Sequence, residues 1–322
     1  MTQHVPRFAA MVAAMAAVAF CPGLLTPASA AAASAQAVAD ARTAASDGTW
    51  GNAVEVPGTA TLNAGGFAVT RSVSCASAGN CSAGGFYTQS TGNHQAFVVG
   101  ETNGLWGTAR EIAAALNAGG FAVAESVSCT SPGNCSAGGF YTDGSGHQQA
   151  FVVREQNGTW GAAKEVPGTA VLNQGGGALI SSVSCASAGN CGAGGFYRDS
   201  SSHGQAFVVN QTNGTWGTAK KVAVALNQGG NAGIASVSCT SAGNCSAGGG
   251  YTDGSGHGQA FVVGETNGTW GTAEEVPGTA ALNHNGRAVV HSVSCAAAGR
   301  CSAGGSYLDG SSHTQAFVVN ET

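Results

Sequence analysis

Short runs that alternate apolar with small or polar residues recur along most of the chain. Four such runs make up one unit, and glycine, asparagine, aspartate or serine bounds each of them. In the first unit they cover 68–75, 81–87, 95–99 and a segment that starts at Trp106. A two-residue period between turn formers is typical of β-strands. The pattern therefore predicts four short strands per unit, and the chain beyond its N-terminal region shows no helical periodicity.

The unit repeats five times with nearly constant length. The separations between successive repeat tryptophans alternate between 56 and 54 residues. These tryptophans are Trp50, Trp106, Trp160, Trp216 and Trp270. Three units contain Val-Pro-Gly-Thr-Ala (56–60, 166–170 and 276–280), and the other two have a shorter run in that place. The variable length therefore lies in one loop, and the remaining spacing is fixed.

Five units of about 55 residues with four strands each predict an all-β fold, a five-bladed β-propeller with four-stranded blades. Segment 46–50 matches the start of a fourth strand, and 315–322 matches a third strand that lacks a fourth. We therefore expect the N-terminal strand to close the last blade, which would leave no free sheet edge. A linear solenoid is the alternative, and it would need atypical units at its ends.

Ten of the eleven cysteines form five pairs with one spacing, C-x5-C. In an exported chain, even numbers and fixed spacing indicate disulfides, whereas zinc sites commonly use C-x2-C. We expect one bridge per blade between its first two strands, and neither a metal nor a cofactor. The expected bridges are Cys75–Cys81, Cys129–Cys135, Cys185–Cys191, Cys239–Cys245 and Cys295–Cys301.

The first thirty residues have the pattern of a secretory signal peptide. Arg7 is their only charge, an apolar run follows at 8–20, and Ala28-Ser29-Ala30 supplies a small-x-small cleavage site. The apolar run is too short to cross a membrane. We therefore expect a secreted, extracellular, monomeric protein. The expected organisation is a signal peptide at 1–30, an Ala-rich linker at 31–46 and the propeller at 47–322.

Composition narrows the classes of function. Charged residues make up 8% of the chain, glycine fills 52 of 322 positions, and the formal net charge is −5. A charge-poor, weakly acidic chain lacks the basic surface that binds nucleic acids or anionic membranes. We therefore expect no nucleic-acid partner and no membrane insertion after signal cleavage. The hydrophobic content of 43% also argues against a disordered chain.

The unit resembles the kelch type of propeller repeat. The resemblance rests on Gly84-Gly85 in the second strand, a turn, a β-branched strand and then Thr-Asn-Gly-x-Trp at 102–106. The cysteine pair is foreign to kelch repeats, and Val98-Val99 stand where kelch has a tyrosine. The unit is also similar to repeats of secreted actinobacterial proteins, with Gln-Ala-Phe-Val-Val matching a His-Ala-Phe-type strand. The resemblance covers 47–322 and implies a ring used as a binding platform or an enzyme scaffold.

A functional site on a repeat protein should lie where the repeats differ. The position before each Ser-Val-Ser-Cys differs in all five units: Arg71, Glu125, Ser181, Ala235 and His291. In a propeller, this column and two columns shortly before it would lie at one mouth of the central channel. We select a candidate ligand-binding site there: Phe67, Arg71, Phe121, Glu125, His284, Arg287 and His291. The alternative explanation is that these positions differ because packing does not constrain loop residues.

Motifs for catalysis are sparse. Glycoside hydrolysis needs two carboxylates about 5 to 10 Å apart, and Glu125 is the only acid in the differing column. The chain also lacks a Gly-x-Ser-x-Gly elbow and a phosphate loop. Four histidines share one hairpin position, but the first unit has Asn93 there and His94 one residue later. A slip of one residue turns a side chain to the opposite face, so we expect exposed hairpin residues rather than a metal ring.

The repeat tryptophans have two interpretations, as sugar-stacking platforms or as packing residues between blades. Taken together, the sequence predicts a secreted, non-catalytic binding module for extracellular or cell-wall carbohydrate, or for a protein partner, at one mouth of the propeller. A polysaccharide hydrolase or lyase that uses Glu125, Arg71 and His291 is one alternative. A structural surface protein is the other.

Overall fold

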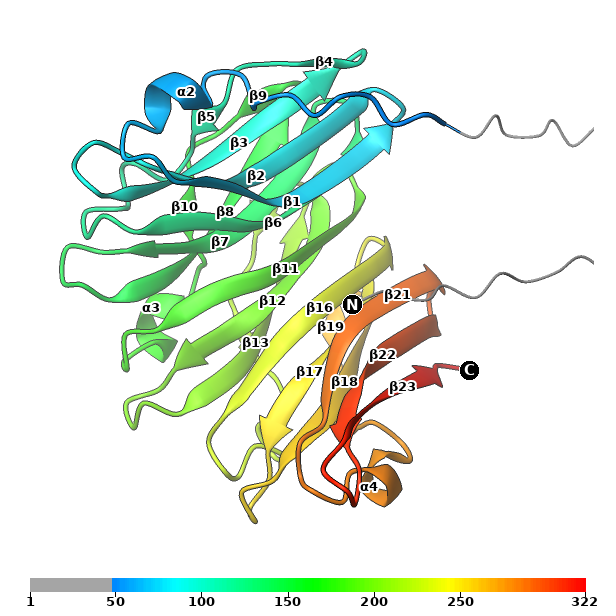
Figure 1. Cartoon of the computed structure of the whole chain (residues 1–322). Coiled ribbons are helices and arrows are strands. Elements are labelled where there is room, and N and C mark those ends of the chain that lie inside the picture. Colours follow the sequence, from blue (N-terminus) through cyan, green and yellow to red (C-terminus); the bar gives the residue numbers. More distant parts are fainter. Residues whose placement is uncertain (1–47) are drawn as a thin grey trace, which may run out of the picture. The chain divides into compact units, whose positions relative to one another are not determined.

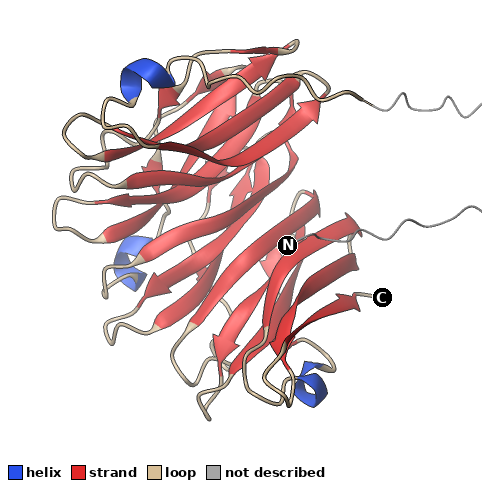
Figure 2. Cartoon of the chain, viewed as in Figure 1, coloured by secondary structure: helices blue, strands red, loops and turns tan. Residues whose placement is uncertain are grey.

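The predicted strands are present in a computed structural model of the chain, which describes residues 48–322 (Figures 1 and 2). The expected signal peptide at 1–30 and linker at 31–46 lie outside the described residues. Each of the five repeats forms one antiparallel sheet, and the sheets follow one another in chain order. Residues 54–322 form one compact unit.

The first sheet contains β1 (Ala68–Ser77), β2 (Asn80–Thr88), β3 (His94–Thr102), β4 (Leu105–Trp106) and β5 (Arg110–Glu111). The second contains β6 (Ala122–Ser131), β7 (Asn134–Thr142), β8 (Gln148–Gln156), β9 (Thr159–Trp160) and β10 (Lys164–Glu165). The third contains β11 (Ala178–Ser187), β12 (Asn190–Arg198), β13 (Gly204–Thr212), β14 (Thr215–Trp216) and β15 (Lys220–Lys221). The fourth contains β16 (Ala232–Ser241), β17 (Asn244–Thr252), β18 (Gly258–Thr266), β19 (Thr269–Trp270) and β20 (Glu274–Glu275). The fifth contains β21 (Val289–Ala297), β22 (Arg300–Leu308) and β23 (Thr314–Asn320).

The two shortest strands of each of the first four sheets are halves of one interrupted fourth strand. In the second sheet, β9 and β10 both pair with β8, through Glu155↔Trp160 and Phe151↔Glu165. Asn157 and Gly158, with φ of 49° and 77°, form the tight turn between β8 and β9, as an Asn-Gly pair favours. The prediction of a five-bladed all-β propeller is confirmed, and the first four blades have the expected four-strand order.

All five expected disulfides are formed, and each joins the first two strands of its blade. In every blade the bridged cysteines are paired across the hairpin, as Cys129 and Cys135 are between β6 and β7. The bridge therefore fastens the innermost hairpin of each blade at one end.

A β-bulge in each first strand lies opposite the double glycine of the second strand. In the second blade the pairing shifts between Ala124 and Ser126, which leaves Glu125 unpaired. The bulge brings the Val123 carbonyl oxygen so close to Gly139 that a Cβ there would overlap it. The same overlap arises at the second glycine of all five pairs. The double glycine is therefore required by the bulge, which bends and twists the strand locally.

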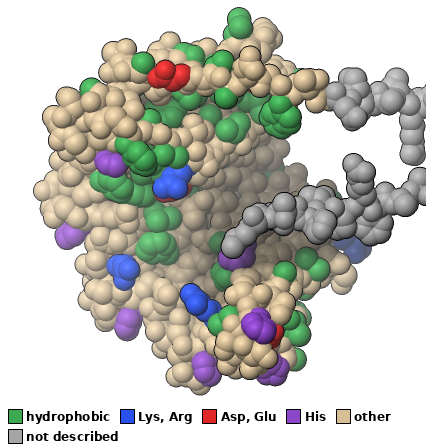
Figure 3. Space-filling model, in the orientation of Figure 1, with side chains coloured by type: hydrophobic (Ala, Val, Ile, Leu, Met, Phe, Trp, Pro, Cys, Tyr) green, Lys and Arg blue, Asp and Glu red, His purple; other side chains and the backbone are tan. Residues whose placement is uncertain are grey.

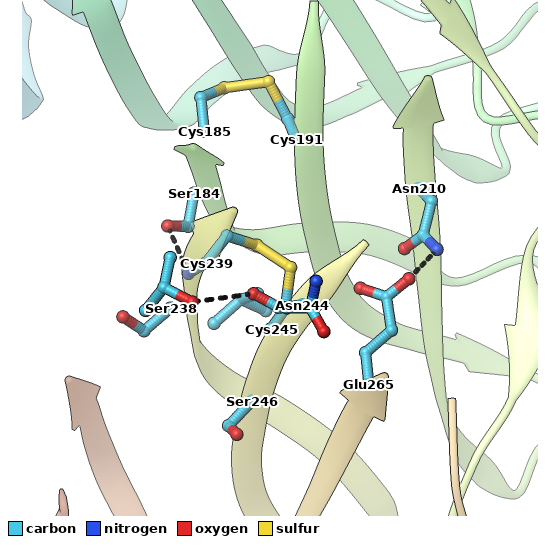
Figure 4. The surroundings of a disulfide bond; sticks show 12 residues. Ser184, Cys185, Cys191, Asn210, Ser238, Cys239, Asn244, Cys245, Ser246 and Glu265 are labelled. Atoms are coloured by element: carbon cyan, nitrogen blue, oxygen red, sulfur yellow. Dashed lines mark hydrogen bonds between the residues drawn. A yellow bond between two sulfur atoms is a disulfide. The ribbon is translucent and has the colours of Figure 1, made fainter. Parts of the chain in front are cut away.

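Neighbouring blades are joined by the serines of Ser-Val-Ser-Cys. The hydroxyl oxygens of Ser126 and Ser128 accept hydrogen bonds from the Val183 and Cys185 N–H groups of the next blade, each at 2.9 Å. Equivalent bonds recur at all four blade interfaces that are formed. Figure 4 shows one of them, from the Cys239 N–H to Ser184. The motif therefore determines how successive blades meet.

The tryptophans of the interrupted fourth strands pack between blades. Trp160 and Trp270 are 6% and 9% exposed, and each belongs to a core cluster with valines of its own blade and of the preceding one. The Trp270 indole N–H also donates to Asn210 Oδ1 of the preceding blade, at 2.8 Å. Of the two interpretations of the tryptophans, packing is the one seen for these residues.

Among residues 48–322, three one-turn helices interrupt the strands (Figure 2). They are α2 (Thr59–Leu62), α3 (Thr169–Leu172) and α4 (Thr279–Leu282). Each lies in one of the longer loops that contain Val-Pro-Gly-Thr-Ala. Four residues are too few to produce a helical period in the sequence, which is why the pattern did not predict them.

The first and last blades do not cover each other. The valine of Ser-Val-Ser-Cys is 57% exposed at Val73 but only 5–8% exposed in the other four blades. On the last blade, Val318 is 86% exposed, whereas the matching Val98 and Val152 are buried. The propeller formed by residues 54–322 is therefore open between these two blades.

The structure differs from the sequence-based prediction at the closing strand, which is not formed. Residues 48–53 contain no strand, and the last sheet has only three strands. A fourth strand contacts the third strand of its own blade and also the next blade. Val56 packs against the first blade, beside Ala83 and Tyr87, but the last blade does not reach it here.

Candidate functional site

The column of residues that differ between repeats coincides with the β-bulges. In every blade the residue before Ser-Val-Ser-Cys is the one that the pairing skips. A bulge redirects a side chain out of the regular alternation, and bulges are common beside functional sites. The five positions are therefore free to vary without disturbing the strand pairing.

An aromatic patch lies where the first two blades meet. We use this name for five rings: Phe67, Phe86, His94, Phe121 and Phe140. The His94 ring stacks on Phe86, with centroids 5.1 Å apart, and lies 4.7 Å from Phe121. Phe67 contacts Phe86 at 5.6 Å, and Phe121 contacts Phe140 at 5.3 Å. Ring pairs at these separations attract each other beyond the area that they bury.

The patch is half buried and half open to solvent. Phe86 and Phe140 are 4% and 6% exposed and form its floor, whereas Phe67 and Phe121 are 55% and 39% exposed. Large exposed aromatic side chains that cluster are uncommon on a protein surface unless they bind something. Figure 3 shows hydrophobic side chains gathered beside a basic one on this face of the molecule.

The backbone holds the patch across the two blades. His94 starts β3 of the first blade, and Phe121 directly precedes β6 of the second. A parallel bridge pairs these two residues, and the His94 N–H donates to the Gly120 carbonyl oxygen at 2.9 Å. The same bridge recurs at the next three interfaces, but no other places two rings together. The backbone pairing that supports the patch therefore recurs at the other interfaces, whereas the pair of rings that it joins does not.

An ion pair borders the patch. The Arg71 Nε atom lies 3.9 Å from a Glu125 carboxylate oxygen, and the Arg71 guanidinium lies 5.7 Å from the centre of the Phe86 ring. Both residues occupy bulge positions, on β1 and β6. The Arg71 side chain is 48% exposed, so this pair contributes little to stability. It instead presents fixed hydrogen-bond donors and acceptors next to the exposed rings.

Burial within the patch lowers the pKa of His94 from its usual 6.5. Its Nδ1 atom is buried and has no hydrogen-bond partner, so protonation would place a charge among the rings without compensation. The unfolded chain therefore binds the proton more readily than the folded one. The stability that this histidine contributes is present above pH 6.5 and is lost as the pH falls below 6.5 toward the folded-state pKa.

We expect the variant His94→Gln to remove this pH dependence. Glutamine is the residue at the matching position of the second blade, Gln148. Between pH 6.5 and about 5, the wild-type protein should lose stability relative to the variant, because only the wild type has an imidazole to protonate in the patch. Urea unfolding at a series of pH values measures the difference. A wild-type minus variant difference that does not change with pH would contradict the proposed burial effect.

The structure brings together four of the seven candidate residues: Phe67, Arg71, Phe121 and Glu125. The other three, His284, Arg287 and His291, are exposed on the fifth blade. There, His291 Nε2 lies 3.0 Å from the Ser306 hydroxyl of its own blade. Within residues 48–322, no hydrogen bond, ion pair or ring contact joins these three to the other four. One group lies on the first two blades and the other on the fifth blade, on opposite sides of the opening in the propeller.

The sequence interpretation did not assign Phe86, His94 and Phe140 to the site. Phe86 and Phe140 lie in second strands, where an apolar residue also fits a packing role. The slip of His94 relative to the other hairpin histidines was the available signal, because it places this ring on a strand that faces the next blade.

The hairpin aspartates and histidines have structural contacts. Asp143 Oδ1 accepts hydrogen bonds from the Ser145 and His147 N–H groups, and its Oδ2 accepts one from the Gln149 amide. Desolvation alone would raise the pKa of Asp143, but these hydrogen bonds together outweigh it, so the pKa lies below its usual value. The described residues contain no group of three or more side chains that could hold a metal ion. In the same part of the chain, no helix is long and apolar enough to cross a membrane.

Comparisons with known proteins give likenesses in fold alone. No family model matches the sequence, and no curated protein matches it. Among solved structures, a protein of unknown function from Dyadobacter fermentans has a TM-score of 0.45 and 13% identity, over 79% of each chain. A Hadza microbial sialidase has a TM-score of 0.44 and 12% identity, over 84% of this chain and 57% of the sialidase. A lectin from Aleuria aurantia, solved with alpha-methyl-L-fucoside, has a TM-score of 0.39 and 10% identity, over 78% of this chain and 72% of the lectin.

Proposed function

We propose that the protein is a non-catalytic binding module for extracellular or cell-wall carbohydrate, and that the aromatic patch is its binding site. The observation that supports this most directly is the pair of exposed rings, Phe67 and Phe121, next to the Arg71–Glu125 ion pair. Exposed rings stack on the apolar faces of sugar rings. Arginine and carboxylate groups at their edge can donate and accept hydrogen bonds with sugar hydroxyls.

The chemistry of the patch favours binding over hydrolysis. Glycoside hydrolysis by the usual route requires two carboxyl groups on either side of the scissile bond, and Glu125 is the only carboxylate that pairs with Arg71 among the described residues. The hydrolase or lyase alternative also placed His291 beside Glu125 and Arg71, and the structure joins only the last two. We therefore propose Glu125 as a ligand contact rather than as a general acid.

The proposal places the module outside the cell and treats the repeat as kelch-like with an added disulfide. Five bridges in a chain of this size favour an oxidising compartment. The residues His284, Arg287 and His291 remain a predicted second contact, for a ligand long enough to reach the fifth blade. A protein partner at the aromatic patch is the second candidate ligand class, because half-exposed aromatics and arginine also dominate protein interfaces.

Retention on insoluble polysaccharides tests the proposal. We expect the mature protein to bind at least one of chitin, cellulose and bacterial cell wall, and Phe121→Ala to weaken that binding about tenfold or more, because it removes an exposed stacking ring. Val171→Ala is the matched control, since Val171 is 75% exposed and lies in α3, away from the patch. Melting curves of both variants verify that the fold is intact.

Three outcomes would contradict the proposal. If none of the three polysaccharides retains the wild type, the carbohydrate assignment fails, and the structural surface protein becomes the better account. If Phe121→Ala binds as well as the wild type, the ligand binds elsewhere. Release of reducing ends that Glu125→Gln abolishes would instead establish the enzyme alternative.

A further inference from the structure

A cavity of about 290 Å³ opens between the fourth and fifth blades. Its lining includes five apolar or sulfur-bearing side chains: Val262, Val293, Cys301, Ala303 and Val319. Protein interiors are close-packed, so open space beside these side chains indicates that a covering side chain is missing.

The corresponding place at the preceding interface is filled by a tryptophan. Trp270 belongs to a buried cluster there, and the cluster contains the residues that match the cavity lining one repeat earlier. These are Val208, Val237, Cys245, Ala247 and Val263. Every one of the five has its counterpart in the wall of the cavity. The cavity is therefore lined by the same residue types that surround the buried Trp270 indole at the preceding interface.

The strand that would carry this indole is missing from the same blade. In the fourth blade, β18 pairs with β19 and β20, whereas β23 pairs only with β22. The free edge of β23 ends with Asn320, beside Glu321, and both residues also line the cavity. An unpaired strand edge next to an apolar cavity can accept another strand.

One segment of this chain matches the missing strand residue by residue. The sequence 47–58 reads Asp-Gly-Thr-Trp-Gly-Asn-Ala-Val-Glu-Val-Pro-Gly, and 267–278 reads Asn-Gly-Thr-Trp-Gly-Thr-Ala-Glu-Glu-Val-Pro-Gly. In the structure, residues 48–53 contain no strand and Trp50 is 98% exposed. A large indole left in water loses the hydrophobic stabilisation that its four counterparts gain.

We infer that residues 49–56 add to β23 as the fourth strand of the fifth blade, with the Trp50 indole in the cavity. The pairing of the other blades sets the register. Glu265↔Trp270 predicts Glu321↔Trp50, and Phe261↔Glu275 predicts Phe317↔Glu55. This register also pairs the two exposed valines Val54 (70%) and Val318 (86%).

The same addition would close the propeller. Val166 shows how, because its N–H donates to the Ala150 carbonyl oxygen of one blade while its side chain packs with the core of the next. Val56 already packs on the first blade, so pairing with β23 would bring the last blade against it. The serines Ser292 and Ser294 would then meet the Val73 and Cys75 N–H groups, as their counterparts do at the other interfaces.

The strand comes from the same chain rather than from a second copy. Val56 is anchored on the first blade and Trp50 lies only six residues away, so the local concentration of the strand exceeds that of any other molecule. A strand exchanged between two copies would give the same contacts but a dimer.

Substitution of Trp50 tests the inference in the mature protein. We expect Trp50→Ala to lower the melting temperature by about 5–15 °C, similar to Trp270→Ala, because each removes a buried indole. Leu105→Ala is the matched control, since Leu105 is 76% exposed on the fourth strand of the first blade and should change little. An unchanged melting temperature for Trp50→Ala would overturn the inference.

An engineered pair of cysteines distinguishes a strand from the same chain from a strand of a second copy. The register predicts Thr49 opposite Thr322, as Thr266↔Thr269 is in the fourth blade. Thr49→Cys with Thr322→Cys should form a bridge within one chain, detected by mass spectrometry of unreduced peptides. Thr49→Cys with Thr266→Cys should not, because Thr266 already has its partner. Bridged dimers, or no bridge with the first pair, would contradict the intramolecular closure.

Discussion

Gly139→Ala is expected to destabilise the folded protein by about 3 kcal/mol or more, the upper end of what overpacking costs. The added Cβ would overlap the Val123 carbonyl oxygen, which the bulge at Glu125 pushes toward it. Relief would require the β6–β7 pairing to open, next to the core of the second blade. Urea unfolding, followed by tryptophan fluorescence, measures the loss.

Gly144→Ala is the matched control in the same blade. The nearest atom that a Cβ at Gly144 would meet is Ala118 Cβ at 3.7 Å, an ordinary contact, so this variant should unfold close to the wild type. Equal stability of the two variants would show that the double glycine is not required by the bulge.

Complete reduction of the five disulfides is expected to unfold the protein at room temperature. Each bridge joins cysteines six residues apart and stabilises by roughly 2 kcal/mol on the loop-entropy model. Five bridges give about 10 kcal/mol, within the usual 5–15 kcal/mol of total folding stability. Far-ultraviolet circular dichroism with and without reductant measures the effect, and a count of ten free thiols verifies reduction. A fully reduced protein that keeps its native spectrum and melting temperature would contradict this assignment.

The repeated features were predictable from the sequence because each recurs in successive units. The strand order, the bridges and the turn at Asn157-Gly158 follow from local spacing and turn chemistry. The role of the double glycine did not follow, because nothing in the spacing shows that Val123 approaches Gly139. The helices α2, α3 and α4 are likewise too short to leave a periodic signal.

The candidate site was predictable only in part. Phe67, Arg71, Phe121 and Glu125 were found because they break the repeat, and they meet at one interface. His94 was recognised as slipped but was not assigned to the site, because its neighbours come from two blades. His284, Arg287 and His291 were grouped with them because all these positions were expected at one channel mouth, and no hydrogen bond or ion pair within residues 48–322 joins the two groups.

The open interface and the aromatic patch concern different parts of the molecule. The patch lies between the first and second blades, whereas the cavity that matches an indole lies between the fourth and fifth. A failure of closure by Trp50 would therefore leave the binding proposal intact, and a failure of carbohydrate binding would leave the closure inference intact.

The aromatic NMR spectrum during titration with an oligosaccharide of a retained polysaccharide tests the binding site most directly. The account predicts that the ring signals of Phe67, His94 and Phe121 shift with added sugar, while those of the buried Phe207 and Phe261 stay in place. A sugar that binds without moving the three patch signals, or that shifts signals on another blade instead, would contradict it.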